Sequence, residues 1–408
     1  MRLRASRLRS FRIGCALALA SLALAPAART APAAERAAGA EPAVLNAEPA
    51  VLKVGTSGDY PPFSLAGEGF DVEVARRMLP DLGFQIAWVP FRWPELAARV
   101  AAGDFDVAMS GITWRPDRAV VGWMSSTVAS GGACVLGASE PTRVGVNRGG
   151  VLERFASAHF PHAEIAAVDR NGDLAGLLTR HEVDAIVTDS FEAPHLMKQR
   201  ALRELRPVCE PALDRKVYWV APARAGELGP RIDAWLALHE SAVDALRAHW
   251  LGGSAPRAAP DELLDLLARR LAMMPAVARW KLAHGVAIDD PAREARVLEA
   301  ARQAALAAGL EPEPVEALFR VQIALASRVQ ASGRAPEDGV PELDLETELR
   351  PELTRLGARI VAAAARVVPL DPGAVDAADW APLGAWLDAT ERAQLRAVLL
   401  GLRRAAAR

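Results

Sequence analysis

The sequence predicts two folded domains in series, a two-lobed α/β domain followed by an all-α domain. The chain has 408 residues, more than a single hydrophobic core usually supports, so two domains are the first expectation. Short apolar segments alternate with amphipathic segments over residues 51–252, which is typical of a mostly parallel sheet covered by helices. From residue 261 to residue 408, apolar residues recur with a helical period instead.

Composition and charge limit the possible partners. Hydrophobic residues make up 51% of the chain and charged residues 24%, as expected for a globular protein. The formal net charge of −2 provides no basic surface for nucleic acid, so we expect no nucleic-acid partner. No segment beyond the N-terminal region is long and apolar enough to span a membrane.

Residues 1–27 have the pattern of a secretory signal peptide. Five arginines precede an apolar region from Ile13 to Ala25, and Ala25-Pro26-Ala27 suits signal cleavage. This apolar region is shorter than a membrane-spanning helix, so we expect release into the periplasm and no membrane attachment. We interpret the Ala-, Pro- and Glu-rich residues 28–50 as a linker to the first strand.

In the α/β domain, which we place at residues 51–252, the expected elements follow from the alternation of apolar runs and turn residues. In chain order they are a strand at 51–56, a helix at 70–79, a strand at 84–89, a helix at 93–102 and a strand at 105–109. The alternation starts again at 143–146 and 185–188, which indicates a second lobe. We expect the chain to pass from the first lobe to the second at 131–142 and to return to the first lobe near 218–221. Ligands in such folds bind in the crevice at the carboxyl ends of the strands.

Two cysteines, Cys134 and Cys209, lie in this domain. In an oxidising compartment an even pair is a candidate disulfide, although two buried free thiols would fit the sequence almost as well. Residues 253–260 are rich in Gly, Ser and Pro, which indicates a linker that lets the two domains fold independently.

The helical domain at residues 261–408 places several charged side chains where they can converge. Arg270 and Lys281 are eleven residues apart, close to three helical turns, so they lie on one face. Pro275 between them should kink this helix. Asp290 and Pro291 open the next helix, which carries Arg293 and Glu294 in its first turn. These groups could hold an anion, or they could be ordinary charges on two solvated helices.

Residues 261–365 resemble the all-helical chorismate mutases, in particular their exported subclass. The resemblance is carried by residues 263–270, 280–281, 288–294, 308–310, 318–323, 330 and 349–353. It implies that chorismate is held through its carboxylates, ether oxygen and ring hydroxyl by Arg270, Lys281, Asp290, Arg293, Glu294, Gln330 and Arg350. The chemistry suits these residue types, because the rearrangement needs no nucleophile but needs positive charge where the C–O bond breaks. Ala326 departs from the family, which usually has Ser or Thr there.

Residues 51–252 resemble the periplasmic amino-acid-binding proteins and, among them, the cyclohexadienyl dehydratases. The latter resemblance is carried by residues 92–96, 147–150, 188–193 and 216–218. It implies that Glu192 is the general acid and that Arg118 binds a substrate carboxylate. Further substrate-binding residues would be Trp93, Ser110, Thr113, Asn147, Asp189 and Lys216. Glu192 could instead cap a helix start, and residues 130–132 and 151–152 depart from the dehydratase pattern.

Together, the two resemblances imply an exported bifunctional enzyme without a metal or other cofactor. It would convert chorismate to prephenate, and then prephenate to phenylpyruvate or arogenate to phenylalanine, with loss of water and CO2. The alternative is an amino-acid-binding or sensing module fused to an active mutase, with Arg118 and Asp189 capturing the ligand. Glu192 favours the enzyme, because a binding protein has no need of an acid there. We also expect a homo-oligomer.

Overall fold

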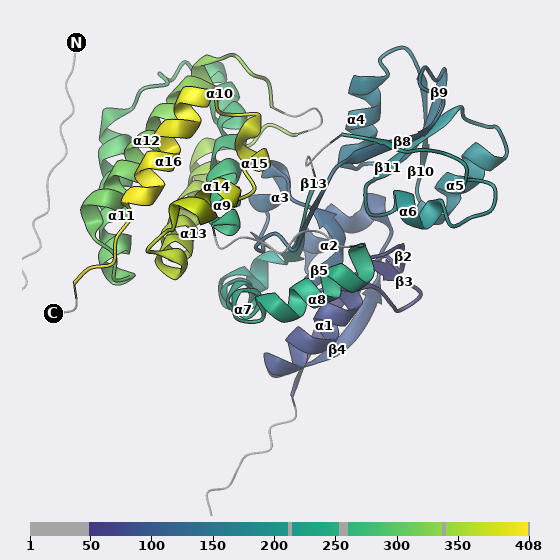
Figure 1. Cartoon of the computed structure of the whole chain (residues 1–408), viewed down its shortest axis with the longest axis horizontal. Helices are drawn as coiled ribbons and strands as arrows, with labels where there is room; N and C mark the ends of the chain where they lie inside the picture. Colours follow the sequence, from purple (N-terminus) through teal and green to yellow (C-terminus); the bar gives the residue numbers. More distant parts are fainter. Residues whose placement is uncertain (1–48, 211–213, 253–259, 337–339, 407–408) are drawn as a thin grey trace, which may run out of the picture. The chain divides into compact units, whose positions relative to one another are not determined.

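The computed structural model describes residues 49–210, 214–252, 260–336 and 340–406, and Figure 1 shows the arrangement of their helices and strands. The expected signal peptide at residues 1–27 lies outside these described residues. So do almost all of the expected linkers at residues 28–50 and 253–260.

The first lobe is built on a six-stranded sheet in which the order is β4-β1-β5-β13-β6, with β7 paired to β13. Its parallel part contains β4 (Phe84–Pro90), β1 (Ala50–Thr56) and β5 (Val107–Thr113). Its antiparallel part contains β13 (Asp214–Val220), β6 (Trp123–Met124) and β7 (Ala129–Gly131). The helices of this lobe are α1 (Phe70–Asp81), α2 (Leu96–Ala102), α3 (Pro116–Ala119), α7 (Ala225–Leu238) and α8 (Glu240–Leu251). Two short strands, β2 (Asp59–Tyr60) and β3 (Ser64–Leu65), and single 3₁₀ turns at Trp93–Glu95 and Pro222–Arg224 complete it.

The second lobe is built on a five-stranded sheet in the order β10-β9-β11-β8-β12. The strands are β8 (Ala133–Gly137), β9 (Arg143–Asn147), β10 (Glu164–Val168), β11 (Ala185–Asp189) and β12 (Val208–Cys209). The helices are α4 (Val151–His159), α5 (Asn171–Thr179) and α6 (Ala193–Leu196). β9, β10 and β11 are parallel, whereas β8 runs antiparallel to both of its neighbours.

The elements expected at 51–56, 70–79, 84–89, 105–109, 143–146 and 185–188 begin within two residues of β1, α1, β4, β5, β9 and β11, because turn residues bound each of them. The exception is the predicted crossing at residues 131–142, which contains β8. This strand pairs with β11 over its whole length, from Ala133 opposite Asp189 to Gly137 opposite Ala185. That pairing joins residues far apart in the sequence, so no local pattern could have predicted it.

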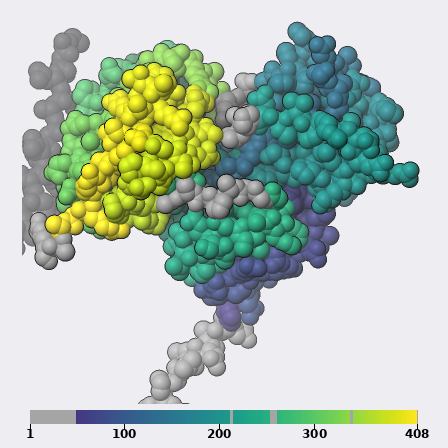
Figure 2. All heavy atoms as spheres, in the orientation of Figure 1, coloured from purple at the N-terminus to yellow at the C-terminus, as the bar shows by residue number. Residues whose placement is uncertain are grey.

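The second region is all-helical. Its helices are α9 (Asp261–Ala272), α10 (Met274–Ala283), α11 (Pro291–Ala307), α12 (Pro312–Ala331), α13 (Arg350–Val367), α14 (Pro372–Ala377), α15 (Ala381–Gly384) and α16 (Ala389–Gly401). A short π-helical turn at Leu345–Leu349 leads into α13. The apolar stripe of α9 is fully buried, as its helical period predicts. In the space-filling view, α16 lies on the surface of this region (Figure 2).

Pro275 ends one helix rather than kinking it. The chain leaves α9 at Ala272 and starts α10 at Met274, with Pro275 in the first turn of the new helix. There a missing N–H does no harm, because the first amides of a helix have no intrahelical partner. Asp290 caps α11 as predicted, and its carboxylate accepts a hydrogen bond of 3.0 Å from the backbone N–H of Arg293.

The helical region and the first lobe share buried side chains. One hydrophobic cluster includes Leu96, Ile112 and Trp219 of the α/β region together with the buried leucines of α9. Polar contacts accompany it, since Arg269 donates hydrogen bonds to the carbonyl oxygen of Ser125 at 2.8 Å and to Thr127 Oγ1 at 2.6 Å. Pro49–Arg408 therefore forms one compact unit.

Candidate active sites

A cavity of about 290 Å³ lies between the helices of the second region. Its lining includes all seven polar residues that the sequence singled out in this region: Arg270, Lys281, Asp290, Arg293, Glu294, Gln330 and Arg350. They come from α9, α10, the start of α11, α12 and the start of α13, so the fold brings together side chains spread over eighty residues of sequence. Apolar groups such as Val277, Phe319 and Leu353 form the rest of the wall.

Positive charge predominates in this cavity. Burial lowers the pKa of Arg270 to about 10, and the nearby charge of Arg293 adds to the effect. Burial also lowers the pKa of Arg293, with Arg350 and Arg296 contributing. Cations whose pKa values are lowered by burial and by each other are short of anionic partners. The cavity therefore favours a ligand with more than one negative charge.

Individual hydrogen bonds orient the cavity's polar groups. Lys281 Nζ donates to the carbonyl oxygen of Ile288 at 2.6 Å, and burial lowers its pKa. Arg350 pairs with Glu346 and lies 3.8 Å from Asp290. Gln330 Nε2 is 3.3 Å from the carbonyl oxygen of Ala326, and its buried Oε1 accepts no hydrogen bond among the described residues. This oxygen can therefore still accept a hydrogen bond from a ligand.

Arg296 also lines this cavity, although the sequence argument passed over it. It follows Arg293 by three residues on α11, so the two side chains share a helix face. That spacing was the signal that could have identified it.

A second, smaller cavity of about 50 Å³ lies in the crevice of the α/β region. Its lining combines residues of both lobes and includes five of the predicted binding residues: Trp93, Thr113, Arg118, Asn147 and Lys216. Ser110, Asp189 and Glu192 are not part of the lining. Ser110 is instead buried in a cluster of hydroxyls, with its Oγ 2.6 Å from Ser64 Oγ and 2.9 Å from Ser57 Oγ.

Arg118 is the cation of this cavity that suits an anionic ligand. Its Nη1 donates to the carbonyl oxygen of Thr113 at 3.1 Å, and its guanidinium lies 5.7 Å from the centre of the Trp219 ring. Burial lowers its pKa to about 10, and the charge of Arg115 adds to the effect. A ligand carboxylate would neutralise the positive charge of the buried Arg118 guanidinium.

Lys216 is already paired with carboxylates. Its Nζ lies 2.6 Å from Asp214 Oδ2 and 3.2 Å from Asp189 Oδ2, and it donates to Tyr60 Oη at 2.9 Å. Burial alone would lower the pKa of Lys216, but the two carboxylates raise it on balance. Asp214 also lines the cavity and accepts a hydrogen bond of 2.6 Å from Thr113 Oγ1. The sequence argument missed Asp214, because only the pairing of β13 with β5 brings it there.

Glu192 is buried beside the crevice, with 1% of its surface exposed. Thr188 Oγ1 donates a 2.5 Å hydrogen bond to its Oε2, and Asp189 Oδ1 accepts its backbone N–H at 2.8 Å. Burial raises the pKa of Glu192 to about 8, and the charge of Asp189 adds to the rise. Although Glu192 stands at the start of α6, its side chain makes no capping hydrogen bond.

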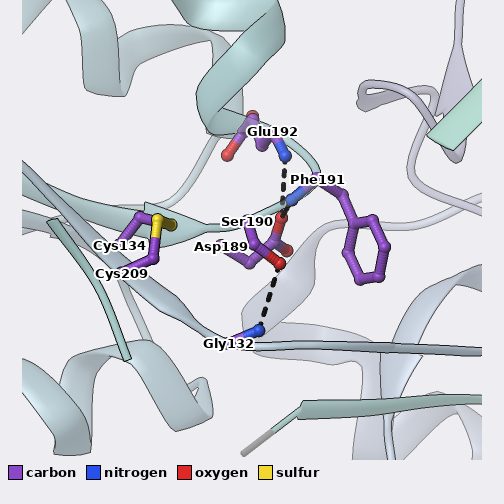
Figure 3. The surroundings of a disulfide bond; sticks show 7 residues. All are labelled: Gly132, Cys134, Asp189, Ser190, Phe191, Glu192 and Cys209. Carbon is purple, nitrogen blue, oxygen red and sulfur yellow. Dashed lines mark hydrogen bonds between the residues drawn. A yellow bond between two sulfur atoms is a disulfide. The ribbon is translucent and has the colours of Figure 1, made fainter. Parts of the chain in front are cut away.

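The side chains of Glu192 and Phe191 leave the turn after β11 in different directions (Figure 3). The ring of Phe191 packs edge-on against Phe63 of the first lobe, at 5.2 Å between ring centroids. The Glu192 carboxyl is bonded to Thr188 in the second lobe.

Residues 52–281 match the protein family described as bacterial extracellular solute-binding proteins, family 3. This match covers more than half of the 408 residues. The chain belongs to that family. In this family 3 chain a second stretch, residues 259–331, matches the family described as chorismate mutase type II.

The individual relatives of this family 3 protein fall into the same two classes, a dehydratase and a chorismate mutase. It is 33% identical over 161 residues to a cyclohexadienyl dehydratase of Pseudomonas aeruginosa, covering 35% of this chain and 60% of that protein. It is 34% identical over 116 residues to a monofunctional chorismate mutase of Enterobacter agglomerans, covering 27% of this chain and 64% of that protein. The chain thus spans less than two thirds of each of these relatives.

Solved structures include an ancestral amino acid-binding protein described as a precursor of cyclohexadienyl dehydratase. It is 25% identical, with a TM-score of 0.45, over 49% of this chain and 95% of that one. Within the described ranges, none of the helices of the family 3 chain is long and apolar enough to cross a membrane. The same residues contain no group of three or more His, Cys, Asp or Glu side chains placed to hold a metal ion.

Proposed function

We propose that the chain is a bifunctional enzyme that rearranges chorismate to prephenate in the helical cavity and dehydrates prephenate to phenylpyruvate in the α/β crevice. The observation that carries the proposal is the helical cavity itself, where all seven predicted residues converge and positive charge predominates. The two partial matches, to a dehydratase and to a mutase, support two consecutive reactions on one chain.

In the first reaction the protein contributes shape and charge. Chorismate carries two carboxylates, which Arg270, Arg293 and Arg350 can bind in a compact conformer. As the C–O bond breaks and the new C–C bond forms, negative charge develops on the ether oxygen. Lys281 and Gln330 both line the cavity, and Lys281 Nζ and Gln330 Nε2 can each donate a hydrogen bond that stabilises that charge. No proton is transferred and no covalent intermediate with the protein is needed.

The second reaction needs one proton. Arg118 binds the side-chain carboxylate of prephenate, and the ring carboxylate leaves as CO2. The electrons of the broken C–C bond enter the ring, and the ring hydroxyl departs from the opposite carbon with the electrons of its C–O bond. The hydroxyl takes a proton from Glu192 and leaves as water, so the ring becomes aromatic. The raised pKa of Glu192, about 8, keeps this carboxyl protonated at neutral pH.

The amino-acid-binding alternative also has an observation in its favour. Asp214 and the cationic Arg118 both line the crevice cavity, and this pair could hold the ammonium and carboxylate of an amino acid. Arogenate carries the same two groups, so Asp214 also makes arogenate a candidate substrate. Asp214→Asn should then weaken arogenate turnover more than prephenate turnover. Amino-acid binding by calorimetry, without turnover of either compound, would favour the binding protein.

The direct test is to incubate the purified chain with chorismate and to follow prephenate and phenylpyruvate over time. We expect chorismate to disappear and phenylpyruvate to accumulate after a prephenate phase. Accumulation of prephenate alone would leave only the mutase. We also propose export to the periplasm with removal of residues 1–27, which the extracellular character of the family supports. N-terminal sequencing of the secreted protein tests this.

A further inference from the structure

A disulfide between Cys134 and Cys209 lies beside the turn that carries Glu192 (Figure 3). Cys134 is fully buried in β8, whereas Cys209 is exposed in the two-residue edge strand β12. β8 pairs with β11 on one side and with β12 on the other. The disulfide therefore joins the edge of the sheet to the strand that supports β11.

The residues of β8 around Cys134 pair with the last residues of β11. Cys134 stands opposite Thr188, and Ala133 stands opposite Asp189. One residue further, the carbonyl oxygen of Gly132 accepts the N–H of Ser190 at 2.8 Å, and the N–H of Gly132 donates to Ser190 Oγ at 3.1 Å (Figure 3). This part of β8 thus sets the position of Thr188, Asp189 and Ser190.

Those residues in turn hold Glu192. Its carboxyl is bonded to Thr188 Oγ1, and Asp189 Oδ1 accepts the backbone N–H groups of Phe191 at 2.9 Å and Glu192 at 2.8 Å. A shift of β8 relative to β11 would move the Thr188 hydroxyl and the Asp189 carboxylate together. The position of Glu192 therefore depends on how firmly the start of β8 is fixed.

Without the disulfide, little would fix the edge of this sheet. β12 has two residues, both exposed, and its contacts with β8 are two residue pairs and one hydrogen bond of 2.8 Å from Glu210 N to the carbonyl oxygen of Ala133. So short an edge strand is weakly held by its backbone alone. The chain then reaches Asp214 and Lys216, five and seven residues after Cys209, so a loose edge would also affect the crevice.

We propose that the Cys134–Cys209 disulfide is a positioning element for Glu192, acting through Thr188, and that it makes the dehydration step sensitive to reduction while the mutase step is not. This inference rests on the proposed function. A dithiol reductant would pass two electrons and two protons to the bridge, giving two protein thiols and a cyclic disulfide of the reagent. The chain has three cysteines, none after residue 209, so reduction changes no bond in the helical region.

The test compares oxidised protein with protein reduced by dithiothreitol, with free thiols counted in each sample. Displacement of a catalytic group by about 1 Å can cost roughly 10²-fold in rate, so we expect dehydration to fall about 10- to 100-fold on reduction. The mutase rate in the same sample should stay unchanged, which also shows that the chain remains folded. The double variant Cys134→Ala/Cys209→Ala should be slow from the start and indifferent to dithiothreitol.

Two variants of Thr188 separate positioning from general stability. The Thr188 hydroxyl lowers the pKa of Glu192, so Thr188→Val should raise that pKa and move the alkaline fall of the dehydration rate to higher pH. Reduction should move it in the same direction, and Thr188→Ser should restore most of the wild-type profile. A merely structural disulfide would change the amount of active protein but not this pH dependence.

Three results would overturn the inference. Reduced protein with two free thiols could keep its dehydration rate and pH profile, which would remove the disulfide from the site. Both activities could fall together, which would indicate general loss of structure. Oxidised wild-type protein could show no dehydration at all, in which case the proposed function of the crevice fails first and the inference falls with it.

Discussion

Burial of a single carboxyl determines the acid chemistry proposed for the crevice. Glu192→Gln keeps the size and hydrogen bonding of the side chain but cannot deliver a proton, so dehydration should fall about 10²- to 10⁴-fold. In the wild type the folded pKa is raised to about 8, so the active protonated form is lost as the pH rises through that value. Phenylpyruvate formation from prephenate, measured from about pH 5 to pH 10, tests both statements. A Gln variant with the wild-type rate would exclude Glu192.

The mutase reaction should depend on single cations of the helical cavity. Arg293→Ala removes one preorganised charge, so the mutase rate should fall about 10²- to 10³-fold while prephenate dehydration stays intact. Arg302 on the same helix is paired with Glu316 and is not part of the cavity lining, so Arg302→Ala is the matched control. Equal loss of both activities in Arg293→Ala would contradict two separate sites.

All seven residues that the resemblance to the helical mutases implied line the helical cavity, whereas only part of the set implied for the crevice lines that cavity. Helical spacing does not explain this result, because Arg270, Lys281 and Arg293 lie on three successive helices, α9, α10 and α11. Asp214 acquires its role only through the pairing of β13 with β5, which brings it to Thr113. Such a pairing depends on tertiary structure, so Asp214 could not be found from the sequence, whereas the hydrogen bond between Thr188 and Glu192 joins residues only four apart.

At the scale of secondary-structure elements, helix α9 contributes both to the helical cavity and to the contact with the first lobe. Arg270 lines the helical cavity, whereas its neighbour Arg269 is fully buried and pairs with Asp265 at 2.8 Å, one turn earlier. Asp265 also lies 3.1 Å from Arg215 on β13 and accepts a 2.9 Å hydrogen bond from Thr127 Oγ1. One helix thus carries a residue of the mutase site and a buried ionic contact with the first lobe.

Removing Asp265 should therefore be costly. Asp265→Ala leaves the buried guanidinium of Arg269 without its nearest carboxylate, and breaking a buried pair in this way typically costs about 3–5 kcal/mol. The measurement is urea unfolding of the full chain. Asp376→Ala is the control, because its partner Arg396 is at the surface and the change should have little effect. Equal stability of the two variants would show that the contact made by α9 contributes little.

At the scale of the whole molecule, the order of the two folded regions followed from the change of periodicity near residue 261. The contact between the two regions could not be predicted from that periodicity, because its ionic and apolar residues are spread over both regions. Arg359 of α13, for example, donates to the carbonyl oxygen of Met124 at 2.8 Å and lies 3.0 Å from Asp233 of α7. No periodic pattern marks such residues as an interface. The expected homo-oligomer stays a prediction, which sedimentation of the purified chain tests.

This contact leads to a prediction about the segment at residues 253–260, where the sequence suggests a linker between independent domains. A protease site inserted there should be cut without separating the pieces, because buried leucines of α9 and the ionic contacts of Arg269 and Arg359 hold them together. After cleavage, size-exclusion chromatography should give one peak at the position of the uncut chain, with both activities present.

Asp265→Ala provides the matched test of that explanation. The same cut in this variant should release part of the protein as separate pieces, since Arg269 and Arg215 lose the carboxylate that they share. If instead the wild-type pieces separate at once and each keeps its own activity, the two domains are independent. In that case the buried contact is too weak to join them, and the interpretation as a simple linker is correct.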